Sequence, residues 1–457
     1  MKSCLPTLAA ILFAVIFVPR DSQAQNPIIQ TIYTADPAPM VYHDTVWLYT
    51  GHDEDGSTWF TMKDWRLFSS TDMVNWTHQG VPLSLKTFSW AASDAWAAQC
   101  IYRNGKFYWY VCAKDKQRNR MAIGVAVGDR PTGPFKDPLG KPLATVSGGD
   151  IDPTVFIDDD GQAWLYWGNP DLWYVKLNED MTSYDQKVGV VKVPLTKESF
   201  GVRLKNEKRL TEYEEGPWLY KRKGLYYLLY PAGGVPEHLA YSTSNSPAGP
   251  WMYRDTVMSI IKKGGAFTNH PGLIDYKGNS YLFYHNGALP GGGGFTRSVC
   301  VDQIQFNADG TIPRIMRTRE GVSSVAHLNP YAWVEAETIA WEQGIETNSE
   351  DGTGVYVTDI NNGDYIKVRS VDFGKGAKRF QANVASAAYG GSIEIHLDSL
   401  NGSLIGTCIV KSTGGLRQWT DQSWIVKKVK EVHDVYFIFK GGEGALFNFN
   451  RWKFTAR

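Results

Sequence analysis

Five short turns, each followed directly by an apolar strand pattern, hold the residues of this sequence that are best suited to chemistry. The turns are Asp36-Pro37, Trp96-Ala97, Asp152-Pro153, Glu215-Gly216-Pro217 and His270-Pro271. Carboxyl groups held close together away from water are costly, because desolvation and mutual repulsion raise their pKa values, and such groups gather at functional sites. A lone Asp-Pro usually does no more than open a turn. The prediction of a site therefore depends on all three acids occupying equivalent positions of a repeat.

The three acids have different neighbours, which suggests different roles. Glu215 is followed by Pro217 and Trp218, an apolar setting that favours a protonated carboxyl group, so we predict that it is a general acid. Asp36 is then the general base. Asp152 is a third group that orients Glu215 and keeps its pKa high through like charge. A protonated acid paired with an ionised base suits the cleavage of a glycosidic bond, in which one group assists the leaving oxygen and the other activates water.

A repeated pair of strands must position these turns. Each copy has an apolar strand, a polar turn and a second strand rich in Tyr, Phe and Trp, and helical periodicity is scarce. The five copies span residues 40–49, 100–110, 155–167, 219–230 and 273–284. Regular β repeats of this length predict an all-β fold with a five-bladed β-propeller. Because the innermost strand of each blade lines the central axis, the five turns are expected to converge on one spot.

The texture of the sequence changes after Pro330, where copies of the repeat stop and short strands with many glycines continue to Arg457. This pattern predicts a β-sandwich of the jelly-roll kind. We therefore expect a signal peptide at residues 1–25, a propeller domain at 26–328 and a sandwich domain at 329–457.

The first residues resemble an export signal. Lys2 precedes an apolar run at 8–18 and the small-residue stretch Ser22-Gln23-Ala24. Cleavage near Ala24 would release a secreted or periplasmic protein. The apolar run is too short to cross a bilayer and no later stretch is long enough, so we expect no membrane span.

The composition limits the partners. Lys and Arg number 47, as do Asp and Glu, so the chain has no net field that would recruit nucleic acid. The 17 Trp and 24 Tyr supply flat rings that suit packing between blades and the apolar faces of sugars. Cys100 and Cys112 either bridge a hairpin or remain buried free thiols, and the sequence leaves both this choice and the oligomeric state open.

The five turns together resemble glycoside hydrolase family 43 over about residues 27 to 325. The resemblance implies an inverting enzyme in which Asp36 is the base, Asp152 modulates the pKa of the acid and Glu215 is the acid. It also implies that Trp96, His270 and Arg297, which follows a Gly-rich stretch, bind the substrate in the pocket. In this family the histidine often lies beside a calcium ion or a water cluster.

The C-terminal part resembles a family 6 carbohydrate-binding module. The resemblance rests on Asn362-Gly363-Asp364-Tyr365, Gly390-Gly391, Thr413-Gly414-Gly415 and Phe447-Asn448. It implies sugar binding by Tyr356, Trp419 and Asn448, and a structural calcium at Glu335 and Glu337, with no organic cofactor. Leu416 stands where the family often has an aromatic residue.

Together these features predict an exo-acting hydrolase that releases α-L-arabinofuranose side chains from arabinoxylan or related plant hemicellulose. The segment around Asp36, with Thr31-Ile32-Tyr33-Thr34-Ala35 before it, resembles arabinoxylan-debranching members of the family. A β-xylosidase or arabinan-degrading enzyme of the same family is the first alternative. A non-catalytic carbohydrate-binding protein is the second, and the presence of all three acids argues against it. The expected partner is plant cell-wall polysaccharide: arabinoxylan, xylan or arabinan.

Overall fold

A computed structural model describes residues 25–204, 208–261, 265–387 and 390–456. The predicted signal peptide lies almost wholly outside the described residues. Within them, the helical segments are the single turns η1 (Leu85–Thr87) and α1 (Lys197–Phe200), and strands dominate everywhere else. The prediction of an all-β protein is confirmed.

The described residues before 305 form strands in five separate antiparallel sheets. The first sheet holds β1 (Thr34–Tyr42), β2 (Thr45–His52), β3 (Asp64–Ser70), β4 (Trp76–His78) and β5 (Leu83–Ser84), and is extended by β22 (Thr338–Ile339). The second holds β6 (Ala91–Ser93), β7 (Ala98–Arg103), β8 (Lys106–Asp115) and β9 (Arg120–Gly128). The third holds β10 (Thr154–Ile157), β11 (Ala163–Trp167), β12 (Trp173–Leu177) and β13 (Val191–Lys192). The fourth holds β14 (Trp218–Arg222), β15 (Leu225–Ala232), β16 (His238–Ser244) and β17 (Met252–Met258), and the fifth β18 (Gly272–Tyr276), β19 (Asn279–Asn286) and β20 (Ser298–Ile304).

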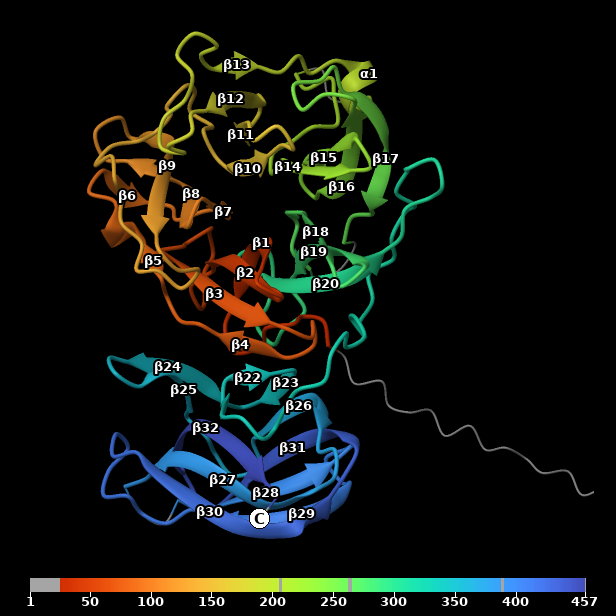
Figure 1. Cartoon of the computed structure of the whole chain (residues 1–457). Helices are drawn as coiled ribbons and strands as arrows, with labels where there is room; N and C mark the ends of the chain where they lie inside the picture. Colours follow the sequence, from red (N-terminus) through yellow and green to blue (C-terminus); the bar gives the residue numbers. More distant parts are fainter. Residues whose placement is uncertain (1–24, 205–207, 262–264, 388–389, 457) are drawn as a thin grey trace, which may run out of the picture.

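The first strand of each predicted repeat lies at the centre of this N-terminal region (Figure 1). The strands β1, β7, β10, β14 and β18 contact one another in that order, and β18 returns to β1. All five predicted copies of the repeat are antiparallel hairpins: β1 with β2, β7 with β8, β10 with β11, β14 with β15, and β18 with β19. The residues that precede these strands are thereby brought to one end of a common centre.

Aromatic rings fill the space between neighbouring sheets. Tyr49 of the first sheet packs edge-on against Trp109 of the second, with ring centroids 4.7 Å apart. Trp76 of the first sheet meets Phe283 of the fifth in the same manner at 6.0 Å. Such rings bury large apolar areas and lock the sheets at fixed angles. Most of the tryptophan and tyrosine noted in the sequence therefore has a packing role.

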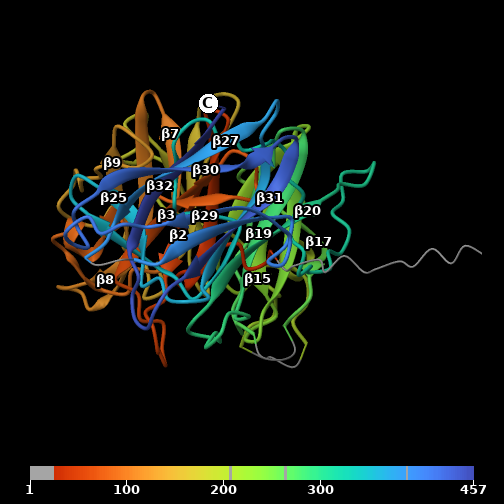
Figure 2. The same ribbon diagram turned by 90° about the horizontal axis from the view of Figure 1, so that it is seen from below.

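The C-terminal region is a β-sandwich of two sheets. One sheet orders β24 (Glu346–Glu350), β25 (Gly354–Thr358), β32 (Asn448–Thr455), β27 (Ala377–Ala385) and β30 (Thr420–Val429), with β21 (Val334–Glu335) paired to β32. The other orders β23 (Trp341–Gln343), β26 (Tyr365–Asp372), β31 (Val432–Lys440), β28 (Ser392–Leu397) and β29 (Ser403–Ile409). Phe380, Phe437 and Trp452 lie in the core between them. Figure 2 shows these strands, seen from below, crossing in front of the N-terminal sheets.

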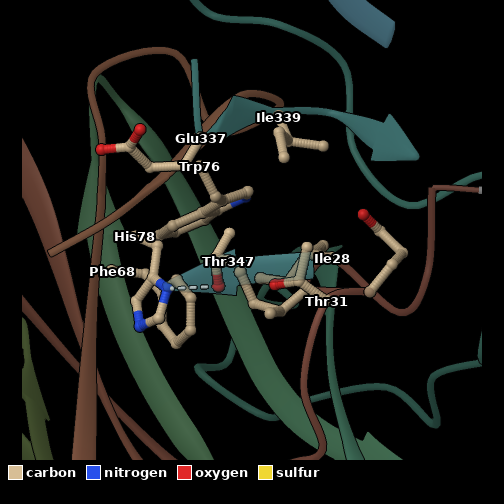
Figure 3. Close-up of a pocket in the computed structure, with 10 residues that line it drawn as sticks. Ile28, Thr31, Phe68, Trp76, His78, Glu337, Ile339 and Thr347 are labelled. Carbon is tan, nitrogen blue, oxygen red and sulfur yellow. Dashed lines mark hydrogen bonds between the residues drawn. The ribbon is translucent and has the colours of Figure 1, made fainter. Parts of the chain in front are cut away.

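The two regions are joined by backbone pairing as well as side chains. β22 pairs with β4, with Thr338 opposite Thr77. Beside this pairing, residues of both regions enclose a pocket of about 10 Å³, which has room for about one water molecule (Figure 3). There His78 of β4 hydrogen-bonds Thr347 of β24 across 3.1 Å. The sandwich therefore packs directly against the first sheet through backbone and side-chain hydrogen bonds.

Two expectations about the chain as a whole can be compared with this structure. Cys100 and Cys112 are free thiols, both buried, so the cross-hairpin bridge does not form. No helical segment among the described residues has the length and apolar character needed to span a bilayer.

Candidate active site

Asp36, inside β1, and Asp152, just before β10, have unusual backbone conformations. Asp36 has φ = 52° and Asp152 has φ = 59°, the left-handed region that Asp tolerates better than most residues. Asp36 also lies in an irregularity of the pairing between β1 and β2, where the register shifts between Ala35 and Ala38. Such bulges re-aim a side chain away from the plane of the sheet. The positive φ values thus set the directions of both carboxyl groups, that of Asp36 within β1 and that of Asp152 two residues before β10 begins.

The fourth turn, Glu215-Gly216-Pro217, places its carboxyl group in a different way. Gly216, and not an acid, occupies the position directly before the proline, with φ = 50°. A Cβ at this position would lie 2.9 Å from Pro231 and 3.0 Å from His270, so only glycine fits. The acid, Glu215, sits one residue earlier and has a longer side chain. This offset explains why the third carboxyl group belongs to a Glu-Gly-Pro turn.

All six residues predicted for catalysis and substrate binding in the N-terminal region line one cavity of about 270 Å³. They are Asp36, Trp96, Asp152, Glu215, His270 and Arg297. The volume is just below the usual range of small-molecule pockets and suits a single sugar ring. The convergence predicted from the repeat is therefore observed, while the roles of the individual residues remain predictions.

Asp36 is surrounded by cationic and imidazole groups. Its Oδ1 accepts a hydrogen bond from Nη1 of Arg297 at 3.0 Å, and Nδ1 of His270 lies 3.7 Å from the same oxygen. Burial lowers the pKa of His270, so this ring is neutral near neutral pH. Both contacts involve Oδ1, and no hydrogen bond found among the described residues reaches Oδ2 of Asp36, which leaves that oxygen for another partner, as a base that must bind water requires.

His285, which the sequence did not point to, holds the backbone of Asp36. The Asp36 N–H donates to Nδ1 of His285 at 3.2 Å, and the opposite ring nitrogen lies 3.0 Å from the Thr268 carbonyl oxygen. The ring is completely buried, and burial together with the charges of Arg297 and His270 lowers its pKa well below the usual value. The neutral ring accepts on one side and donates on the other, which fixes its tautomer.

Arg297 is held in turn by Asp53, a second residue missing from the predicted site. Asp53 accepts from the backbone N–H, Nε and Nη2 of Arg297 at 2.8, 2.9 and 2.9 Å. The Arg297 guanidinium also lies 5.0 Å from the centre of the Phe60 ring. A bidentate pair of this kind fixes the direction of the guanidinium. Asp53 belongs to the acidic run after β2, so its position was visible in the sequence but its partner was not.

Glu215 keeps part of its population protonated near neutral pH, as a general acid requires. Burial, with further contributions from the charges of Glu214 and Asp36, raises its pKa to about 7. Its Oε2 accepts a hydrogen bond from Nδ2 of Asn169 at 2.6 Å, which acts in the opposite direction. Asn169 is also absent from the predicted set. It follows β11, and Arg209 donates to its Oδ1 at 2.8 Å, so its amide orientation is determined.

The charges of the other two acids affect the pKa of Asp152. Burial comes first, followed by the charges of Glu215 and Asp36, and together they raise the pKa of Asp152 well above its usual range. Its Oδ2 accepts from the Gly216 N–H at 3.1 Å, and so links the third turn to the fourth. This contact ties Asp152 to the segment that bears Glu215, and the orienting role of Asp152 stays a prediction.

Aromatic residues form one side of the cavity and extend beyond it. Trp96 is fixed by a hydrogen bond from its Nε1 to the Phe60 carbonyl oxygen at 3.0 Å. Trp59, which is 60% exposed, and Phe60 line both the cavity and an adjoining open hollow of about 660 Å³. Phe295 packs edge-on against Phe60 at 4.8 Å. The cavity thus adjoins a larger hollow whose lining includes an exposed indole ring.

The predicted sugar-binding residues of the sandwich lie close together, but they are engaged with one another and with neighbouring residues of the protein. The rings of Tyr356 and Trp419 meet edge-on with centroids 5.2 Å apart, so no sugar ring fits between them in this arrangement. The side-chain amide of Asn448 is engaged at both ends: it accepts from Thr358 Oγ1 at 2.8 Å and donates to the Leu416 carbonyl oxygen at 2.8 Å. Binding here would require the two rings to separate.

The predicted calcium ligands differ in their surroundings. Glu337 is buried and its Oε2 has no hydrogen-bond partner, which fits an oxygen ligand, whereas Glu335 is exposed beside Arg451. Among the described residues, three potential ligands gather only at His52, Glu54 and Asp64. There Arg66 already donates to Asp64 at 2.8 Å and Lys63 to Glu54 at 2.9 Å. The Glu335 and Glu337 pair therefore fits a calcium ion only in part.

Comparisons with known proteins agree with this geometry. A sequence model described as Glycosyl hydrolases family 43 matches residues 24–312, and one described as Carbohydrate binding module (family 6) matches residues 335–456. The chain is 35% identical to an Arabinoxylan arabinofuranohydrolase of Bacillus subtilis (strain 168), in an alignment that covers 100% of this chain and 97% of that protein.

Solved structures give the same result. A crystal structure of a glycoside hydrolase family 43 arabinoxylan arabinofuranohydrolase from Bacillus subtilis, in complex with cellotetraose, has a TM-score of 0.81 at 33% identity and covers 95% of this chain and 98% of that chain. A calcium-free β-xylosidase/α-arabinofuranosidase from a compost microbial metagenome, in complex with xylotriose, has a TM-score of 0.57 at 31% identity and covers 65% of this chain and 98% of that chain. The chain therefore belongs to glycoside hydrolase family 43 and ends in a family 6 carbohydrate-binding module.

Proposed function

We propose that this protein hydrolyses the bond between α-L-arabinofuranose side chains and the backbone of arabinoxylan or a related hemicellulose. The observation that carries the proposal is the single cavity in which Asp36, Asp152 and Glu215 meet. Its volume of about 270 Å³ suits one pentose, and the adjoining hollow beside Trp59 leaves room for a polymer outside it. This arrangement suits removal of one terminal sugar at a time. The similarity to arabinofuranohydrolases along the full chain supports the choice of sugar.

The residues of the cavity can divide the chemistry of an inverting hydrolysis. In its protonated form, Glu215 gives its proton to the leaving oxygen as the glycosidic bond breaks. Asp36 accepts a proton from the water that attacks the anomeric carbon from the opposite face. An inverting enzyme needs room for that water, and its two carboxyl groups are therefore about 6.5–9.5 Å apart.

The other residues prepare these two groups. Asp152 holds the turn of Glu215 through Gly216, while burial and the charges of Glu214 and Asp36 keep the pKa of Glu215 high. Arg297 orients Asp36 while its own direction is fixed by Asp53. Preorganised partners of this kind contribute to the rate because they need not rearrange during the reaction.

A β-xylosidase activity is the second candidate. A cavity for one pentose accepts xylopyranose as readily as arabinofuranose on volume alone, and the similar enzyme from compost carries both names. A protein that only bound sugar would have no need for a buried acid with its pKa raised to about 7.

The deciding experiment compares pentose release from arabinoxylan, linear xylan and linear arabinan. Arabinose from arabinoxylan with little product from either linear polymer supports the proposal. Xylose from linear xylan as the main product would replace it with the xylosidase alternative. An early NMR spectrum of the released sugar should show the inverted anomer, and a retained anomer would remove Asp36 from the role of base.

We infer further that the five N-terminal sheets are the five blades of a propeller spanning residues 26–328, and that the sandwich spans 329–457. The cycle of contacts among the five central strands supports the first inference. We also propose that residues 1–25 direct export to the periplasm or the medium, which fits a polymeric plant substrate. Mass spectrometry of the exported protein would give an N-terminus near Gln25 if this is correct.

Calcium binding at Glu335 and Glu337 is proposed as a structural feature of the sandwich. Two nearby carboxylates and the unpartnered Oε2 of Glu337 support it. Removal of divalent ions by a chelator should then lower the melting temperature of the protein, and Glu337→Gln should abolish that response. A melting temperature that does not respond to the chelator in the parent would exclude the site.

A further inference from the structure

A fourth acid, Glu237, lines the same cavity without a role in the chemistry described above. It lies between β15 and β16, directly before His238, and is 3% exposed. Its own backbone N–H donates to the Phe267 carbonyl oxygen at 2.8 Å. The residue is therefore a fixed part of the cavity wall and not a surface side chain that has turned inward.

The two oxygens of Glu237 have different environments. Oε2 accepts a hydrogen bond from the Asn269 backbone N–H at 2.8 Å, whereas Oε1 is buried and has no partner. A buried polar atom without a hydrogen bond destabilises the fold, and native proteins retain few such atoms. Because the side chain lines the cavity, a bound ligand is the natural source of the missing partner.

Glu237 also differs from Glu214, the residue next to Glu215, in the positive charges around it. Glu214 forms ion pairs with Arg203 and Arg209. Glu237 has no ion pair among those found for the described residues, and its charge environment is set by other acids. Burial, followed by the charges of Glu215 and Glu214, raises its pKa well above the usual value. Since Oε2 accepts from the Asn269 N–H, the proton of the neutral carboxyl group belongs on Oε1, which can then donate.

We propose that Glu237 is a sugar-binding residue whose Oε1–H donates a hydrogen bond to one hydroxyl group of the pentose held in the cavity. This inference rests on the proposed function and deepens it, because it names a specificity-determining contact for the same site. Acid, base and modulator are already supplied by three other residues, so Glu237 selects the ligand and takes no part in bond breaking. A hydroxyl group is required because the site offers a donor with no other acceptor.

The test uses an aryl α-L-arabinofuranoside and its analogues that lack one hydroxyl group at a time. Glu237→Ala should lower kcat/KM for the full substrate by about tenfold, the effect of one lost hydrogen bond and a vacated cavity wall. One analogue should lose about the same factor with the parent enzyme and show no further loss with Glu237→Ala. Glu237→Gln should stay close to the parent, because its amide N–H donates where the carboxyl O–H did. Glu212→Gln is the matched control: this nearby acid does not line the cavity, and its kinetics should be unchanged.

The outcomes separate this inference from the proposed function. Equal losses for every analogue in Glu237→Ala would mean a structural role and overturn the inference, as would a Glu237→Gln variant as slow as Glu237→Ala. If the parent releases no sugar from any aryl pentoside, the proposed function fails. In that case, calorimetric binding of free L-arabinose and D-xylose still decides the inference: weaker binding by Glu237→Ala than by the parent supports it, and equal or absent binding overturns it.

Discussion

The cavity of the N-terminal region, whose acids were predicted from the repeat, and the aromatic site of the sandwich, which was predicted from a family resemblance, differ in one physical respect. In the cavity, the acids keep unused hydrogen-bonding capacity: Oε1 of Glu237 is buried without a partner, and Asp36 engages Arg297 through one oxygen. In the sandwich, Tyr356 and Trp419 contact each other and Asn448 has used both ends of its amide. The cavity therefore has polar atoms available to a ligand, whereas the side chains of the sandwich site are already bonded to or in contact with other residues of the protein.

This difference shows that the right residue types do not suffice to define a binding site. A ligand binds well where it supplies hydrogen bonds and apolar contacts that the free protein lacks. Where the free protein already satisfies these groups, the ligand has to break them first, and its affinity falls by the cost of doing so. We therefore expect the largest mutational effects in the cavity and the smallest in the sandwich.

The largest effect should come from the two groups that carry the reaction. Glu215→Gln and Asp36→Asn should each lower kcat by roughly two to four orders of magnitude, since each removes a general acid or base while keeping the side-chain shape. Initial rates on arabinoxylan measure this, with melting temperature as the control for folding. Near-parental activity in either variant would remove that residue from the mechanism.

Loss of the support for Arg297 should have the next largest effect. Asp53→Asn replaces an oxygen that accepts from the guanidinium with an amide N–H that cannot, so Arg297 should lose its orientation toward Asp36. We expect kcat/KM to fall by roughly tenfold to a hundredfold, in line with hydrogen bonds to charged groups. The stability of the fold is followed by thermal unfolding. A variant with unchanged kinetics would show that Arg297 keeps its position through Asp36 alone.

A smaller effect should appear mainly in the pH profile. Activity requires protonated Glu215, whose pKa is about 7, so the rate should fall as pH rises through that value. The Asn169 amide favours the ionised form of Glu215, and Asn169→Ala should therefore raise this pKa and move the alkaline limb to higher pH. Below the limb, kcat/KM should fall by about two- to tenfold. An alkaline limb that moved to lower pH would contradict the assignment of Glu215 as the acid.

The smallest effect should come from the sandwich. Trp419→Ala should weaken adhesion to insoluble xylan by about fivefold, corresponding to about 1 kcal/mol for one aromatic platform. Turnover of a small aryl pentoside should not change, because that substrate enters only the N-terminal cavity. Trp424→Ala, in another partly buried tryptophan of the sandwich, is the matched control. Unchanged adhesion would mean that the closed pair of Tyr356 and Trp419 does not open for xylan. A loss of small-substrate turnover would instead identify Trp419 as a packing residue.

Sequence alone predicted the parts of this protein that depend on local pattern. The five hairpins follow from apolar strands and polar turns that recur along the chain, and four of the five turns carry a proline beside an acid or a histidine. Repetition then determined that Asp36, Asp152 and Glu215 should meet, because equivalent positions in a radial repeat lie at equal distances from its centre. The glycine of the Glu-Gly-Pro turn was visible as well, although its tight fit against Pro231 was not.

Only the tertiary structure decided which groups complete the site and which site is open. Asp53 and Arg297 are 244 residues apart, and Asn169 reaches Glu215 from a loop of another sheet. His285 and Glu237 belong to no motif, because their roles follow from burial and from the partners each atom finds or lacks. In the sandwich, the sequence supplied two aromatic residues but not the distance between their rings. Contacts of this kind depend on how separate sheets pack, and no local pattern of residues encodes that packing.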